Sequence, residues 1–118
     1  MSNFVAWTLF FVGIAHLVFG FVRFKKPLVR AASAGFINQF QEIEAYAAFW
    51  FLMSGPPLML SGHLAIHAVA AGDLYSLQLI GIYTLVSAVI GAIAFPKSPF
   101  WVPLVLSPFL IAAGYGML

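Results

Sequence analysis

Four long apolar segments dominate this chain and limit the folds that it can adopt. The hydrocarbon core of a bilayer is about 30 Å thick, and about 20 apolar helical residues cross it. The segments that reach this length cover about residues 3–22, 43–71, 74–95 and 100–117. Closed β-barrels also satisfy their backbone groups in lipid, but their strands alternate apolar and polar residues, and no such alternation occurs here. The sequence therefore predicts an all-α fold, a single bundle of four transmembrane helices over residues 1–118.

The scarcity of charge supports the same interpretation. Hydrophobic residues make up 64% of the chain and charged residues 7%, whereas soluble domains carry about 25% charged residues to cover their surface. Most of the surface is therefore expected to face membrane lipids. The chain has no cysteine, which excludes disulfides, thiolate metal sites and cysteine nucleophiles.

The placement of the basic residues predicts the orientation of the bundle. Two of the three links between segments hold all of them: Arg23, Lys25, Lys26, Arg30 and Lys97. By the positive-inside rule both of these links are cytoplasmic, so both termini and Asp73 lie outside. The first link is either a platform for lipid headgroups or a partner, or it holds charge that only sets the topology. Because topology explains the basic residues, no nucleic-acid partner is expected. The first residues lack the basic region of a signal peptide, so the first segment is expected to be a retained anchor.

Prolines predict interruptions at two places. Pro27 in the first link should interrupt any helix there, because proline lacks an N–H group and clashes with the preceding turn. A straight helix over residues 45–71 would be about 40 Å long at 1.5 Å per residue, which is too long for a simple span. It must tilt, protrude or bend, and Gly55-Pro56-Pro57 offers the bend.

Small residues predict where helices touch. Gly13 and Gly20 lie on one face of the first segment with His16 between them, and a second stripe follows the third segment at Gly81, Thr84, Ala88 and Gly91. Such stripes let helix backbones approach closely within lipid. They also suit association between copies, so a homo-oligomer is expected.

His16 is the first candidate for chemistry, because ionisable side chains inside a membrane are costly and often functional. Glu44 at the start of the second segment is a candidate to orient the imidazole, as in a general acid–base pair. The alternative for His16 is a neutral ring hydrogen-bonded to a neighbouring helix. The alternative for Glu42 and Glu44 is an ion pair with Arg23 or Arg30, or a place at the helix N-terminus.

Further residues are candidates for ligand binding. Asn38 and Glu42 contribute to a polar cytoplasmic mouth, and Trp50 provides an apolar wall near His16. Tyr83 lies deep enough in the third segment to be a core residue.

His63 and His67 are weak candidates for a metal site. Their i, i+4 spacing places them on one helical face, as in paired histidine ligands, but no third ligand is evident except Asp73. A haem held between His16 and His63 would need similar depths, and the count along the helices gives a mismatch of about 10 Å. A haem on one histidine stays open, and the alternative is a pair of interfacial histidines.

Three sequence pieces resemble a group of small four-helix bacterial membrane proteins of unassigned function: GIAHLVFG (13–20), AFWFLMSG (48–55) and PKSPFWVPLV (96–105). The resemblance implies a multi-pass protein of the bacterial inner membrane, with His16, Trp50 and Trp101 as recurring features. It implies no activity, and it does not include His63 or His67.

Three functions follow as hypotheses. The first is a site for a lipophilic small molecule between the first two segments. There His16 would be the acid or base of an isomerase or an epoxide-opening enzyme, Glu44 its orienter and Trp50 the wall. The second is an accessory, structural or haem-binding subunit. The third is a transporter of the small multidrug type, against which the absence of a carboxylate within the first segment argues.

Overall fold

The computed structural model describes residues 1–97 and 100–118, and the described residues contain helices and no strand. The helices are α1 (Ser2–Arg23), α2 (Lys25–Ser33), α3 (Ile43–Met53), α4 (Gly55–Ala71), α5 (Leu74–Ala94) and α6 (Trp101–Gly114). The fold is therefore all-α, as predicted.

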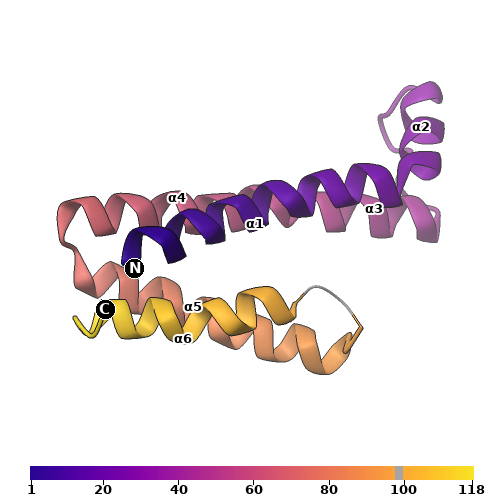
Figure 1. Ribbon diagram of the computed structural model, residues 1–118. Coiled ribbons are helices and arrows are strands. Elements are labelled where there is room, and N and C mark those ends of the chain that lie inside the picture. The colour runs from indigo at the N-terminus through magenta and orange to yellow at the C-terminus, as the bar shows by residue number, and fades with distance from the viewer. Residues whose placement is uncertain (98–99) are drawn as a thin grey trace.

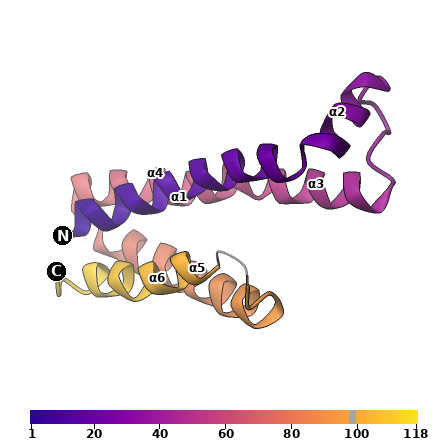
Figure 2. The same cartoon turned by 45° about the vertical axis from the view of Figure 1, so that its right-hand side comes forward.

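The helices form two antiparallel pairs. In the first pair α1 runs along α4 and α3, which follow each other end to end, and in the second pair α5 packs on α6 (Figure 1). Both termini and the connection between α4 and α5 lie at one end, whereas α2, the last turn of α5 and the first turn of α6 lie toward the other (Figure 2). All five basic residues therefore lie toward one end of the molecule.

Pro27 does not interrupt the helix in which it lies, which corrects that part of the prediction. It occupies the first turn of α2, where its missing N–H group has no helical partner to lose. The interruption lies at Phe24, where α1 ends and the chain turns into α2. The proline ring disfavours the turn before it, so the break falls upstream of the proline itself.

The second apolar segment consists of two helices with a break at Ser54. Pro56 and Pro57 have no N–H groups, so two backbone hydrogen bonds of a continuous helix cannot form. Across the break, the Ser54 N–H donates to the Trp50 carbonyl at 3.2 Å and the Leu58 N–H to the Ser54 carbonyl at 3.3 Å. The bend expected from Gly55-Pro56-Pro57 is thus a local break that leaves α3 and α4 aligned along α1.

Glycines bring α1 and α4 into close contact. A Cβ atom on Gly62 would lie 2.3 Å from the backbone nitrogen of Phe10, and one on Gly13 would lie 2.7 Å from that of Met59. A Cβ on Gly81 of α5 would lie 2.9 Å from the backbone nitrogen of Ile111 on α6. The predicted contacts through Gly13 and Gly81 are confirmed.

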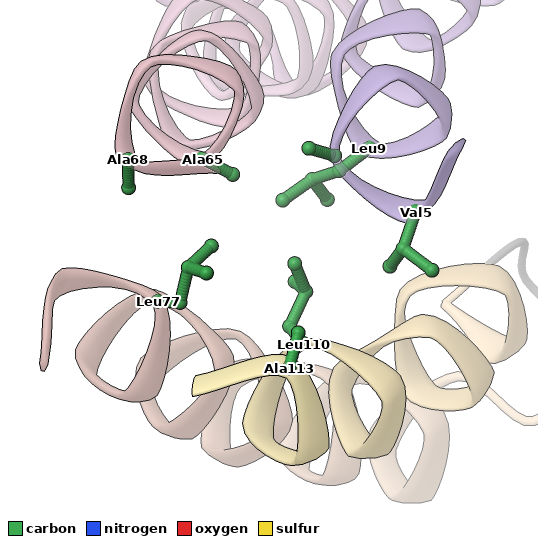
Figure 3. Close-up of a cluster of buried hydrophobic side chains, with 8 residues drawn as sticks. Val5, Leu9, Ala65, Ala68, Leu77, Leu110 and Ala113 are labelled. Carbon is green, nitrogen blue, oxygen red and sulfur yellow. The ribbon is translucent and has the colours of Figure 1, made fainter. Parts of the chain in front are cut away.

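A cluster of buried side chains joins the two helix pairs near the end that holds both termini (Figure 3). Its members come from α1, α4, α5 and α6: Val5, Ala6, Leu9, Ala65, Ala68, Leu77, Leu110 and Ala113. No contact between α3 and either α5 or α6 occurs among the described residues. The helix pairs are therefore held together at one end only.

Two helices, α1 and α5, are long and apolar enough to cross a membrane, and α6 is apolar but shorter. Within the most apolar stretch of each long helix, 28% of the residues are buried. Most residues of these stretches are therefore not buried inside the structure.

Candidate functional site

A large groove lies between the two helix pairs. One wall comes from α1, α3 and α4 and the other from α5 and α6. The groove is open to the outside along its length, and its volume is about 2120 Å³. It extends from His67 and Asp73 near one end to Phe24 and Lys97 near the other, and most of its lining is apolar. Pockets for compact small molecules typically enclose about 300–1,000 Å³, so this groove has room for a considerably longer ligand.

His16 lies on the groove wall and is held by α3. Its ring stacks on that of Phe51, with centroids 4.0 Å apart and planes 13° from parallel. Its Nε2 lies 2.6 Å from the Phe51 carbonyl oxygen, and because a carbonyl only accepts, Nε2 is the donor. In the neutral ring the other nitrogen, Nδ1, then carries the lone pair. This hydrogen bond matches the alternative in which His16 is a neutral ring bound to a neighbouring helix. It also fixes the tautomer and the orientation of the ring, as a proton acceptor requires.

Trp50 and Tyr83 line opposite walls of the groove. Trp50 on α3 is 54% exposed and contacts the rings of Tyr46 and Phe49. Tyr83 on α5 is 72% exposed. The expectation that Tyr83 is a core residue is therefore wrong, because α5 directs its small residues, not this ring, into the contact with α6.

The two glutamates lie on Arg30, outside the groove. The Arg30 guanidinium donates to Glu44 Oε2 at 3.1 Å and forms an ion pair with Glu42 Oε1 at 3.7 Å. Asn38 lies in the exposed connection between α2 and α3 and accepts a hydrogen bond from Gln41. The structure thus gives Glu44 a basic partner, while the group that orients His16 is the Phe51 carbonyl. Both glutamates adopt the ion-pair alternative, and neither they nor Asn38 line the groove.

Sequence reasoning missed three contributors to the groove. Phe51 supplies the carbonyl, Ser54 lies at the helix break, and Lys97 lines the basic end. For the break at Ser54 the available signal was Pro56-Pro57, since a proline pair marks backbone that departs from regular helix just before it. No local signal pointed to the Phe51 carbonyl or to Lys97.

His63 and His67 do not form a metal centre with a third ligand. Among the residues that the structure describes, no three His, Cys, Asp or Glu side chains gather closely enough to hold a metal ion. His63 lies beside Phe10 outside the groove, and His67 lines the groove near Asp73. The Ser76 hydroxyl and backbone N–H both donate to Asp73, and these hydrogen bonds hold the pKa of that exposed carboxyl below its usual value.

Comparison with known proteins identifies a family for this chain. Residues 1–115 match the model of DUF6463, described as a family of unknown function. No curated protein and no solved structure matches the chain.

Proposed function

Since this chain belongs to the DUF6463 family of unknown function, we propose a function from its own geometry: a membrane protein that holds a lipophilic small molecule in the groove beside His16. The proposal has two parts, a bundle that spans the membrane and a ligand site within it.

The membrane part of the proposal adds two spans to α1 and α5. The helices α3 and α4 are aligned, and together they cover a full span that is divided at Ser54. The apolar helix α6 pairs with α5 as the fourth span. With all five basic residues toward one end, the positive-inside rule places that end in the cytoplasm and both termini outside. We assign the bundle to the inner membrane of a bacterium, following the resemblance of its three sequence pieces.

The ligand part rests on one observation: His16 is half-buried at the groove wall and its Nε2 is bound to the Phe51 carbonyl. Such a ring carries its lone pair at Nδ1, and its side chain is part of the groove lining. In a largely apolar environment an oriented imidazole can accept or return a proton. Trp50 supplies an aromatic wall nearby. A proton shift on a lipophilic molecule requires a base that takes up a proton and returns it, which this arrangement supplies. Opening an epoxide would also require a water molecule to attack the ring carbon, with His16 taking the proton of that water and a proton returned to the epoxide oxygen.

Native mass spectrometry of the protein in mild detergent tests the site. The unmodified protein should carry a stoichiometric extra mass, which His16→Ala should reduce at least tenfold, a loss of about 1.4 kcal/mol in binding. His63→Gln is the matched control, because His63 lies outside the groove lining, and it should retain the adduct. Equal adduct in His16→Ala and the unmodified protein would show that the site lies elsewhere.

His16→Gln separates a reactive role from a structural one. The glutamine amide can still donate to the Phe51 carbonyl, but it cannot take up a proton. Retained binding without conversion of the bound molecule supports the acid–base role. If His16→Gln still converts the bound molecule, His16 has no acid–base role. A homo-oligomer that carries no adduct supports the accessory subunit instead.

A further inference from the structure

We propose that the ligand of the groove is an anionic phospholipid, with its headgroup at Lys97 and its acyl chains along the groove. The inference rests on the proposed function and names the class of molecule that the site takes. It is argued from the distribution of charge and from the size of the groove.

The basic end of the molecule carries positive charge that no carboxylate neutralises. Glu42 and Glu44 both pair with Arg30, and Asp73 lies at the opposite end. In the described part of the chain, no ion pair joins a carboxylate to any other basic side chain, which leaves Arg23, Lys25, Lys26 and Lys97. An anionic headgroup is therefore attracted to this end, and because the attraction falls with distance and is screened by salt, the charge nearest the headgroup contributes most.

Lys97 differs from the other unpaired basic residues because it lines the groove itself. On the opposite wall at this end lies Phe24, and the guanidinium of Arg23 lies 5.4 Å from the centre of that ring. The apolar groove thus ends at an ammonium group, with a guanidinium close to its rim. A lysine ammonium is a compact point charge that suits a phosphate.

The groove itself matches hydrocarbon chains. Its volume of about 2120 Å³ exceeds that of pockets for compact ligands. Its few serine hydroxyls on α4 and at the break donate within the helix, Ser54 to the Trp50 carbonyl and Ser61 to the Pro57 carbonyl. Because both serine hydroxyl hydrogens are already donated to backbone carbonyls, this wall needs few polar groups on the ligand.

The bound lipid can be tested by native mass spectrometry with two synthetic probes of identical acyl chains, phosphatidylglycerol and phosphatidylcholine. The unmodified protein should bind phosphatidylglycerol more tightly. Lys97→Gln should lower that preference about fivefold, the effect of one basic residue near a lipid surface. Lys97→Arg should retain it, since the charge is kept.

Lys26→Gln is the matched control. It removes the same charge at the same end, but Lys26 does not line the groove. Its effect on the preference should stay below twofold. An equal effect of both glutamine variants would mean that the attraction is diffuse, and it would overturn the assignment of the headgroup to Lys97.

A groove-filling variant distinguishes failure of this inference from failure of the proposed function. Ser87→Phe places a ring in the groove and should weaken lipid binding, whereas Val86→Phe, on an exposed residue outside the lining, should not. Equal binding of both lipids that Ser87→Phe weakens would keep the lipophilic site and reject the anionic ligand. Binding that Ser87→Phe does not affect, or a groove closed by a second copy of the chain without lipid, would reject both.

Discussion

Replacing Gly62 by alanine is expected to destabilise the protein by about 2 kcal/mol, because the added methyl group overpacks the contact between α1 and α4. Its Cβ would lie 2.3 Å from the Phe10 nitrogen and 2.4 Å from the Phe10 Cα. These are backbone atoms, so no side-chain rotation can relieve the clash and α1 itself must move. In an unconstrained helix the same change would stabilise by about 1 kcal/mol, since alanine is the better helix former. The two effects have opposite signs, and the structure predicts that packing dominates.

The sign of this stability change can be measured by thermal unfolding of Gly62→Ala in detergent, monitored by the loss of the helical circular dichroism signal. Ala70→Ser is a suitable control, since it adds one heavy atom at an exposed position of the same helix. The control should unfold close to the unmodified protein. An unchanged or raised unfolding temperature for Gly62→Ala would refute the close approach of α1 and α4.

The second large effect is expected for Leu110→Ala, at about 3 kcal/mol, within the range for truncating a buried leucine. Leu110 is fully buried in the cluster that joins the two helix pairs (Figure 3). Its neighbours in this cluster include Leu9 from α1 and Leu77 from α5. Because α3 makes no contact with the second pair, little else in the described part of the chain holds the pairs together. The cavity should therefore weaken the join between the pairs more than either pair itself.

Val105→Ala is the comparison for this cavity, because Val105 lies on α6 but is mostly exposed. Its effect on unfolding should stay below 1 kcal/mol, as for most surface substitutions. Limited proteolysis should show new cleavage between α4 and α5 in Leu110→Ala only. If both variants unfold alike and resist cleavage alike, the cluster does not join the pairs.

Much of this fold was predictable from local sequence. The apolar segments matched the helices closely, because a stretch of apolar residues that long has few alternatives to a helix. Gly13 and Gly81 were recognisable as contact residues from their spacing alone, since a stripe of small residues has one main use between apolar helices. The break near Pro56 was also expected, because a proline pair cannot continue the backbone hydrogen bonds.

The site was less predictable, because it depends on which helices meet and at what depth. Glu44 and His16 belong to adjacent segments, and the sequence alone allowed them to pair. In the structure α2 folds back beside α3, and this brings Arg30 to Glu44. His16 instead donates to a backbone carbonyl, and such a partner cannot be predicted from residue types because every residue has a carbonyl. Tyr83 and Lys97 face the groove because the pairs join only at one end, and this geometry follows from tertiary packing.

The most direct test of the account is the topology of the chain, because the proposed ligand site requires a groove that lies within the bilayer. The chain has no cysteine, so single-cysteine variants need no prior substitutions. Lys26→Cys and Asp73→Cys can be labelled with a membrane-impermeant maleimide from each side of sealed vesicles. Four spans predict that Lys26→Cys and Asp73→Cys are labelled from opposite sides. Labelling of both from the same side would mean that α3 and α4 do not cross the membrane, and it would contradict the account.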